Sequence, residues 1–420
     1  MGDRALAHIE KIVKTYPIEG ADNIEMVQVL DFHVVAKKGE FKTDDTVVYI
    51  EVDSILPDGL DDDLKASYDI LKKELKKATG ERISEIEREM SDIISKNTRP
   101  EFEFLRQKKF RIKVLKYNFD NGFGEKIYSM GIVFSTSILP IGSCEIVEGT
   151  DVTQILGITK VVEDLEELNS TTDVDERSLI ETFLDNKFNR YKFYRKMKKK
   201  IKGEKISGKW LDIFPPRSDE ENAQKVYSKI VENHGREGYY KSEKCEGQNE
   251  TFYLLQSSSF FGFGKKWNFG VCSRTRNLIT DDGSDFWKTA KELDAEKKLR
   301  KVGKNIFVRG ERCAPKLQNN IYGFKGNKFF VFDVYDLDEQ RLYTFGEMIK
   351  FCNDYGFEHV PILDDNYIIP ETVQEILNES NGYSVFGEKV LREGIVIRKK
   401  DNPKVSFKAR SPEYLLKWGK

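Results

Sequence analysis

The C-terminal half of the chain contains a series of short β-prone runs, each carrying a charged residue at its end or on one face. In chain order these charged residues are Lys244, Arg274, Glu311, Glu393 and Lys408. The runs are rich in β-branched and aromatic residues and are separated by turn signals and helical patterns, which predicts strands. From about residue 206 onward we therefore expect an α/β domain whose strands present ionisable groups.

Lys244 lies in the segment Glu243-Lys244-Cys245-Glu246-Gly247, between two runs that predict strands. A lysine at a strand end can act as a covalent nucleophile once its amine has lost a proton, and its ordinary pKa is about 10.4. Burial, a neighbouring cation or a metal-bound substrate can lower that pKa. The same Lys-x-x-Gly spacing recurs at Lys77, Lys200 and Lys205. Taken alone, Lys244 is therefore also compatible with an exposed strand-end lysine.

The composition limits the class of protein. At 420 residues and 39% hydrophobic side chains, the chain is long enough for two or three domains with cores of their own. Its formal net charge is -2, so any nucleic-acid contact has to come from local basic patches. The five cysteines form no C-x-x-C pair, which argues against a zinc ribbon and for a reducing compartment. Without an apolar signal region or a membrane-spanning run, we expect a soluble intracellular monomer, cytoplasmic or nuclear.

Residues 1–160 predict a small β-barrel of the OB type. Its β-prone runs are residues 5–9, 25–30, 33–36, 46–52, 110–115 and 132–135. Within this module, residues 60–98 place apolar side chains at helical spacing on both sides of Gly80, which predicts an inserted helical hairpin. Barrels of this type bind nucleic acid on one strand face, whereas the insert is either a solvated packing appendage or a contact for a partner or nucleic acid.

Residues 161–205 predict a charged linker. The stretch 161–186 is acidic, whereas 187–205 holds ten Lys/Arg residues with aromatic side chains between them. Such alternation suits a segment that follows a phosphate backbone, although a solvated linker carries similar charge. The candidate contacts in this stretch are Lys198, Lys199 and Lys200.

Taken in order, the charged strand stretches resemble the motif set of covalent nucleotidyltransferases, which include polynucleotide ligases and mRNA capping enzymes. The likeness is closest to ATP-dependent RNA ligases of the Deinococcus RNA ligase-like group, which have an N-terminal OB module. Residues 218–224, and 16–22 with 37–41, carry likenesses specific to that group. The resemblance implies an α+β fold: an OB-type β-barrel with a helical insert, then an ATP-grasp-like α/β nucleotidyltransferase domain of antiparallel sheets and helices over residues 206–420.

The resemblance also implies roles for the motif residues. Lys244 would be the adenylylated lysine, and Lys408 would hold the α-phosphate. Glu393 and Glu311 would be the metal-binding carboxylates, directly or through water, and Phe332 would stack on adenine. Further cofactor-binding residues implied by the match are Glu243, Glu246, Gly247, Arg274 and Ser406. The implied nucleic-acid contacts outside the linker are Arg274, Arg276, Lys37 and Lys38.

The sequence departs from the family pattern at two positions. Motif I usually has Asp where this chain has Glu246, and motif V often has a lysine where it has Ser406. Lys404 or Arg410 could replace that missing lysine. The cysteines beside the motifs are expected to be small buried strand residues: Cys245, Cys272 and Cys313.

The implied function is that of an ATP-dependent RNA ligase using ATP and Mg²⁺ or Mn²⁺. Such an enzyme forms a lysyl-AMP intermediate, adenylylates a 5′-phosphate and joins it to a 3′-hydroxyl in nicked duplex RNA or an RNA/DNA hybrid. No second OB module follows the last motif within these 420 residues, unlike in DNA ligases and capping enzymes. The alternatives are a DNA ligase, a guanylyltransferase capping enzyme and a non-catalytic nucleic-acid-binding protein with the same fold.

Overall fold

The computed structural model of the chain divides into two compact units, residues 162–414 and residues 2–161, the second of which also takes in residues 415–420. The structure describes residues 5–57, 67, 70–71, 73–75, 80–97, 99–120, 126–160, 207–209, 215, 220–258, 265–274, 276–278, 281, 283–315, 317–318 and 320–418. The predicted linker, with Lys198, Lys199 and Lys200, lies outside these ranges. The exact domain boundaries therefore stay a prediction.

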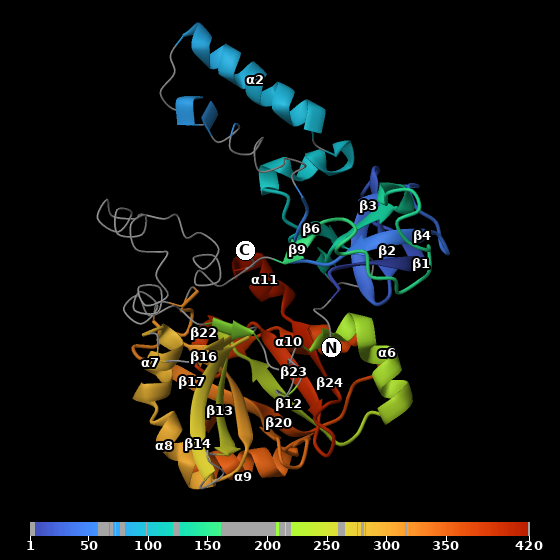
Figure 1. The fold of residues 1–420 in the computed structure, drawn as a ribbon. Helices are drawn as coiled ribbons and strands as arrows, with labels where there is room; N and C mark the ends of the chain where they lie inside the picture. The colour runs from blue at the N-terminus through green and yellow to red at the C-terminus, as the bar shows by residue number, and fades with distance from the viewer. Residues whose placement is uncertain are drawn as a thin grey trace, which may run out of the picture. The chain divides into compact units, whose positions relative to one another are not determined.

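The N-terminal unit is built on an antiparallel sheet of five strands in the order β3-β2-β1-β4-β8 (Figure 1). The strands are β1 (Ala7–Pro17), β2 (Ile24–Val29), β3 (Phe32–Lys37), β4 (Thr46–Ile50) and β8 (Ile132–Ser135). Side chains such as Ile9, Val27, Val34 and Val48 are fully buried along these strands. Buried and partly exposed positions alternate in the first half of β3, whereas residues 7–10 of β1 and 47–50 of β4 are buried without interruption, as expected where both faces of a strand are covered. The predicted OB-type module is confirmed.

Short elements complete this unit. The two-stranded pairs are β5 (Ser54–Ile55) with β9 (Thr159–Lys160), and β6 (Leu115–Asp120) with β7 (Lys126–Ser129). Helix α2 (Glu81–Asn97) lies between β5 and the 3-10 helix η1 (Pro100–Lys108), where the insert was predicted. Of the first arm of the predicted hairpin, only isolated residues belong to the described part of the chain.

The predicted strand at residues 110–115 is wrong in its bounds. Lys109 and Phe110 have φ values of 54° and 56°, so the backbone leaves the extended conformation where the strand should begin. Arg111 forms only an isolated bridge with Ile55, and the regular strand β6 begins at Leu115.

The larger sheet of the C-terminal unit has eight strands, with the path β10-β15-β14-β13-β16-β17-β18 and β19 paired to β17. They are β10 (Ser207–Lys209), β13 (Gln248–Ser258), β14 (Lys265–Ser273), β15 (Arg276–Leu278), β16 (Ile306–Cys313), β17 (Lys328–Asp336), β18 (Arg341–Leu342) and β19 (Glu358–His359). All pairs except β17–β19 are antiparallel.

The second sheet of this unit has five strands in the order β11-β24-β23-β12-β20. They are β11 (Glu221–Asn222), β12 (Tyr239–Lys244), β20 (Ile362–Tyr367), β23 (Gly394–Lys399) and β24 (Ser406–Arg410). The hairpin β21 (Tyr383–Ser384) and β22 (Gly387–Leu391) precedes β23, and helix α11 (Pro412–Trp418) follows β24. The chain passes from this sheet to the larger one between β12 and β13, immediately after Lys244.

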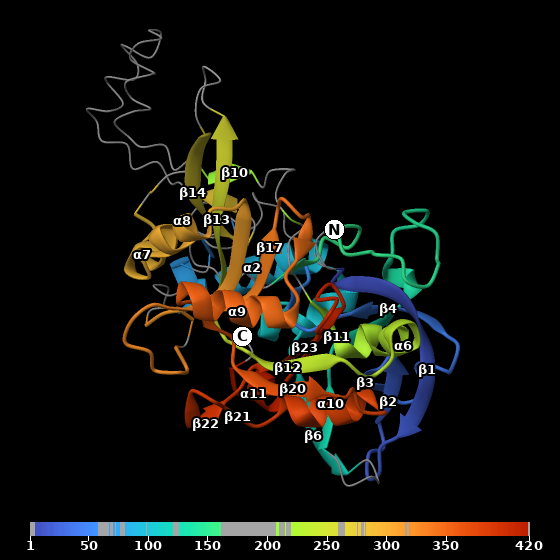
Figure 2. The ribbon, with the colours of Figure 1, turned by 90° about the horizontal axis from the view of Figure 1, so that it is seen from below.

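Helices cover each sheet on one side (Figures 1 and 2). The larger sheet is packed by α7 (Asp285–Glu292), α8 (Ala295–Val302) and α9 (Phe345–Tyr355), which contribute Phe286, Leu299 and Phe351 to one core. The smaller sheet is packed by α6 (Ala223–His234) and α10 (Val373–Ser380), with Ile376 buried against β23 and β24. Among the described helices, none is both long and apolar enough to cross a bilayer.

Two helix predictions need correction. The helix expected near residues 285–300 is split into α7 and α8, because Asp294 adopts a left-handed conformation with φ of 53°. The helix expected to begin at 218–221 instead begins at Ala223, because Glu221 and Asn222 form strand β11, parallel to β24.

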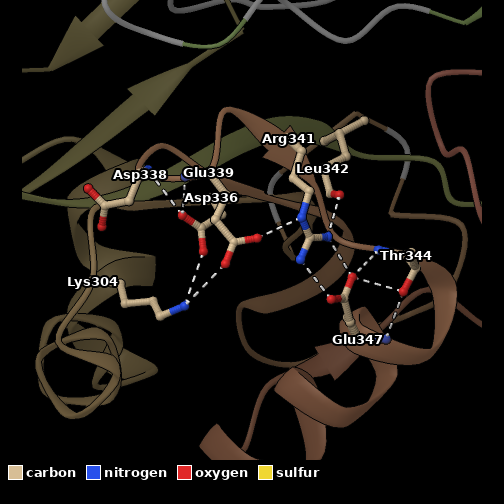
Figure 3. A network of polar contacts seen from close by, with 8 residues as sticks. All are labelled: Lys304, Asp336, Asp338, Glu339, Arg341, Leu342, Thr344 and Glu347. Atoms are coloured by element: carbon tan, nitrogen blue, oxygen red, sulfur yellow. Dashed lines mark hydrogen bonds and ion pairs between the residues drawn. The ribbon is translucent and has the colours of Figure 1, made fainter.

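A polar network ties the end of β17 to helix α9 (Figure 3). The Asp336 carboxylate, which is fully buried, accepts bonds from the backbone N–H groups of Asp338 and Glu339 and pairs with Lys304 at 3.3 Å. On the helix side, Arg341 donates to both oxygens of Glu347 at 2.7 and 2.8 Å. The network fixes the turn that leads from the sheet into the helix.

The N-terminus of α9 is closed by a capping box. Thr344 accepts from the backbone N–H of Glu347, whose carboxylate accepts from the backbone N–H of Thr344. The hydrogen bonds from Arg341 hold the pKa of Glu347 down at about 2. Because the folded-state pKa is depressed, the stabilisation is present above the ordinary pKa of about 4.3 and is lost as pH falls towards 2.

We expect Glu347→Ala to weaken the first turn of α9 by about 1–2 kcal/mol, because it removes the capping acceptor and the partner of Arg341. Hydrogen exchange of the α9 amides would measure this loss, which should shrink between pH 6 and pH 3. The control Lys350→Ala, which breaks the exposed Lys350–Asp354 pair on the same helix, should change protection by less than about 0.5 kcal/mol. Equal hydrogen-exchange protection of α9 in wild type and Glu347→Ala would contradict the stabilising role of Glu347 at the start of this helix.

Candidate active site

Three cationic side chains share one face of the smaller sheet. Lys244 on β12 lies opposite Gly394 on β23, and Gly394 lies opposite Arg410 on β24. Lys408, two residues before Arg410, points to the same side because side chains alternate along a strand. The other face of these strands packs Ile395, with Ala409, into the apolar core against α6 and α10. The alternation therefore sends the cations away from that core.

Glu393 pairs with the central lysine. Its Oε1 lies 2.7 Å from Lys244 Nζ and 3.8 Å from Arg410 Nε. The side chain of Lys244 is 25% exposed, so it is not sealed off from solvent. Gly394, next to Glu393, has φ of 158°, and a Cβ there would lie 2.2 Å from the Ala409 carbonyl oxygen. Glycine is therefore required for the close strand approach that brings these groups together.

The pKa of Lys244 is raised above its ordinary value. Burial acts to lower it, and so does the positive charge of Arg410, but the carboxylates of Glu393 and Glu311 outweigh both. In the free chain, the Lys244 amine is therefore held in its protonated form. The protein alone does not lower the pKa of Lys244. A lower pKa would require added positive charge at the carboxylates of Glu393 and Glu311.

Glu311 comes from the larger sheet. It lies on β16 opposite Asn249 of β13 and Phe330 of β17. A Cβ on Gly247 would lie 2.8 Å from Glu311 Cγ and 2.4 Å from the Arg312 carbonyl oxygen. This geometry requires glycine at residue 247, since no larger residue leaves space for β16.

The ring of Phe332 is half-buried on β17, where Arg398 of β23 holds its backbone. Arg398 is buried, donates to the Phe332 carbonyl oxygen and pairs with Glu220 at 2.5 Å. The guanidinium carbon lies 6.0 Å from the centroid of the Phe332 ring. Arg398 therefore links three segments next to Phe332: Glu220 before β11, strand β17 and strand β23.

The two acids that flank Lys244 differ in their surroundings. The Glu243 carboxylate is buried on the core side of the sheet and accepts from the backbone N–H of Val385 at 2.9 Å. Burial raises its pKa. Glu246 accepts from the hydroxyl of Tyr414 at 2.9 Å. The predicted nucleotide contact of Glu243 receives no support from this geometry.

The buried cysteines behave as expected of small strand residues. Cys245 and Cys313 pack in one cluster with Phe330 and Val360, and burial raises the pKa of both thiols. Cys272 is fully buried on β14. Raised pKa values keep thiols protonated, which disfavours a role as nucleophile or metal ligand.

The remaining predicted residues lie farther along the elements. Arg274 and Arg276 are half-buried at the β14–β15 turn, where the Arg276 backbone N–H donates to Ser273 Oγ. Ser406 lies on the same face as Lys408 but opposite Arg398, four residue pairs away from the Gly394–Arg410 pair that lies in the row of Lys244. The exposed residues Lys37 and Lys38 belong to the N-terminal unit, so the structure does not relate them to Lys244.

The carboxylates suit a hard divalent cation. Glu393 and Glu311 act on the same amine, and oxygen ligands are those that Mg²⁺ and Mn²⁺ prefer. In the described part of the chain, no group of three or more His, Cys, Asp and Glu side chains is arranged to hold a metal. A metal here would therefore take part of its coordination from phosphate oxygens or water.

Three residues make contacts at this site that the sequence pattern indicated only weakly or not at all. Arg410, named only as a substitute for a missing lysine, lies beside Glu393, and its spacing of two from Lys408 is the signal for a shared face. Arg398 is signalled by the alternation along β23. Tyr414 contacts Glu246 across 168 positions of sequence, and no local pattern predicts that contact.

Comparison with known proteins gives a consistent result. Residues 237–417 match the RNA ligase family, and residues 6–97 match an OB-fold domain family. A Naegleria gruberi RNA ligase variant solved with ATP and Mn is 26% identical, with a TM-score of 0.67, covering 99% of this chain and 100% of that one. The same ligase solved with pyrophosphate is 27% identical, with a TM-score of 0.67 and coverage of 99% and 98%. No curated protein sequence matches the chain.

We expect Glu393→Gln to lower the pKa of Lys244, because the amine loses its closest negative charge. Trace acetylation across a pH series, read by mass spectrometry of the Lys244 peptide, would measure the shift without depending on any enzyme activity. Glu379→Gln is the matched control, since Glu379 pairs at 2.7 Å with Lys241 on the same strand. It should leave the Lys244 profile in place, and an unshifted profile in Glu393→Gln would contradict the pairing.

Proposed function

We propose that this chain, whose residues 237–417 belong to the RNA ligase family, seals 3′-hydroxyl/5′-phosphate nicks in duplex RNA or RNA/DNA hybrids through a lysyl-AMP intermediate. The chain is an ATP-dependent RNA ligase with an N-terminal OB-fold domain, and ATP and a divalent metal ion are its cofactors. One observation carries the proposed mechanism: Lys244 lies 2.7 Å from Glu393, with Arg410 beside the same carboxylate.

In the first step, the Lys244 amine attacks the α-phosphorus of ATP. A nitrogen–phosphorus bond forms, the bond from the α-phosphorus to the bridging oxygen breaks, and pyrophosphate leaves. The amine must first give up its proton, which the ion pair with Glu393 opposes until positive charge reaches that carboxylate. Because phosphoryl transfer depends mainly on position and charge, the rigid strand end of β12 is a suitable platform for the nucleophile.

Lys408 and Arg410 supply positive charge on the same sheet face as the nucleophile. Lys408 is 6% exposed, and a cation that is largely removed from water interacts more strongly with phosphate. We assign the second cationic position of motif V to Arg410 rather than to Ser406, because Arg410 lies in the same row of paired residues as Lys244. Its planar fork can bind two phosphate oxygens at once.

Glu393 and Glu311 would hold the metal ion. When bound, Mg²⁺ or Mn²⁺ neutralises charge on phosphate oxygens. The pairing of Lys244 with Glu393 supports this assignment, since a cation at that carboxylate would weaken its hold on the lysine proton. Phe332 would then stack on the adenine ring, and Arg398 fixes the strand that carries it.

The later steps need the polynucleotide. An oxygen of the 5′-phosphate attacks the phosphorus of the lysyl-AMP, and the nitrogen–phosphorus bond breaks, which frees the amine. The 3′-hydroxyl then attacks the phosphorus of the adenylylated 5′ end, forms the phosphodiester bond and releases AMP. We assign the incoming 5′-phosphate to Arg274, with Arg276 beside it. The OB-fold domain, including Lys37 and Lys38, and the basic linker would contact the duplex through phosphates rather than base edges.

Lys244→Ala should abolish protein labelling by α-labelled ATP with Mg²⁺ or Mn²⁺, because it removes the amine to which the nitrogen–phosphorus bond is assigned. The matched control is Lys241→Ala, since Lys241 lies on the same strand and is also ion-paired, to Glu379. It should retain labelling within about threefold, because surface ion pairs contribute little. Label retained by Lys244→Ala would overturn the site, whereas an unlabelled wild type that still binds duplex would favour the non-catalytic alternative.

Sealing of nicked duplexes separates the RNA ligase from the DNA ligase alternative. We expect a nick with a ribonucleotide at its 3′-hydroxyl end to be sealed at least about tenfold faster than an all-DNA nick, since the 2′-hydroxyl is the group that distinguishes the two. The 5′-phosphate and template strands should be varied separately between RNA and DNA. Equal rates on both 3′ ends would contradict the RNA assignment while leaving the lysyl-AMP chemistry intact.

A further inference from the structure

Glu246 is held at three points. Its backbone N–H donates to the hydroxyl of Tyr322 at 2.6 Å, and its carbonyl oxygen accepts from the Cys313 thiol at 3.2 Å. Its carboxylate accepts from the hydroxyl of Tyr414 at 2.9 Å. Glu246 is 7% exposed and Tyr414 is 5% exposed, so the last bond is shielded from water. The residue two positions after Lys244 is therefore fixed in backbone and side chain.

Tyr414 is itself fixed to the rest of the site. Its backbone N–H donates to Ser411 Oγ at 3.1 Å, and the Ser411 backbone N–H donates to the carbonyl oxygen of Glu393 at 2.9 Å. Ser411 directly follows Arg410. The turn of residues 411–414 thus connects three parts of the site: Arg410 by the chain, Glu393 by a backbone bond and Glu246 by the Tyr414 hydroxyl.

The length of the Glu246 side chain suits its hydrogen bond to Tyr414. An aspartate at this position would end about 1.5 Å short of the glutamate carboxylate, too far for the 2.9 Å bond to Tyr414 without a backbone shift. Because the bond is buried, a lost partner would leave a polar oxygen unsatisfied. The longer side chain is thus the one that fits a tyrosine at residue 414.

We propose that Tyr414 is a positioning residue for the adenylylation step: its hydroxyl fixes Glu246 and thereby the end of β12 that presents Lys244. Glu246 acts here as a hydrogen-bond acceptor for Tyr414 and not as a ligand of nucleotide or metal. This inference rests on the proposed function, since the readout is transfer of adenylate to Lys244.

The test compares single-turnover adenylylation at saturating ATP in four variants. Tyr414→Phe removes only the hydroxyl and should slow the step by about 10- to 100-fold, the cost of a small misplacement of the nucleophile. The KM for ATP should stay within about threefold, because Tyr414 does not touch the nucleotide. Glu246→Ala should slow the step to a similar extent as Tyr414→Phe, and the double variant should be no slower than the slower single variant, since both remove the Tyr414–Glu246 bond.

Glu246→Gln gives the readout that separates the possible roles. The amide oxygen of glutamine can accept from Tyr414 as the carboxylate does, so this variant should recover most of the rate lost in Glu246→Ala. A Glu246→Gln variant as slow as Glu246→Ala would mean that the negative charge itself is used, and would overturn the inference. An undiminished rate in Tyr414→Phe would overturn it equally.

The matched control is Tyr227→Phe, which removes a hydroxyl that donates to the Pro370 carbonyl oxygen at 2.8 Å in the same unit. It should adenylylate at the wild-type rate. Thermal unfolding of all variants shows whether any loss reflects global stability: a merely structural Tyr414 would lower the melting temperature without changing the rate of the folded protein. If wild type takes no label, the proposed function fails; if only the Tyr414 and Glu246 results fail, that function stands.

Discussion

The ion pair between Lys244 and Glu393 is the contact on which the proposed chemistry of this protein depends. It exists because Gly394 lets β23 approach β24 closely, which places the residue before Gly394 next to the end of β12. A strand-end lysine without that neighbour would be an ordinary cation. With Glu393 beside it, the Lys244 amine has a hydrogen-bonded acceptor at 2.7 Å. A second cation, Arg410, lies 3.8 Å from the same carboxylate oxygen.

The same pair sets the state of the free protein. Burial and Arg410 act to lower the pKa of Lys244, but two carboxylates outweigh them, so the amine waits in its protonated form. Cations that reach Glu393 and Glu311 would remove this restraint. The nucleophile would then become competent when nucleotide and metal ion arrive together, which limits unproductive reaction of an exposed amine.

The sequence anticipated the longer strands that carry the motifs, β12, β13, β14, β16, β17, β23 and β24, because they contain β-branched and aromatic runs with a charged residue at an end or on one face. It did not predict the shorter strands β10, β11, β15 and β18 to β22. It failed where the backbone changes conformation without a strong local signal. Lys109 and Phe110 leave the extended region, and Asp294 breaks a helix, although glycine or proline marks neither site. For motif V, the sequence left Lys404 and Arg410 open as substitutes for the lysine missing at Ser406, and strand pairing puts Arg410 in the row of Lys244.

By itself, the sequence determined which residue types are available and the order of the strands that carry them, since β propensity and the alternation of side chains are local properties. That was enough to predict Lys244, Glu311, Glu393 and Lys408 as a set. Only the tertiary structure decided which side chains face one another: the place of Arg410, the hold of Arg398 on Phe332 and the bond from Tyr414 to Glu246. These contacts join residues 17 to 168 positions apart, and sheet register and chain crossing, rather than any local pattern, bring such residues together.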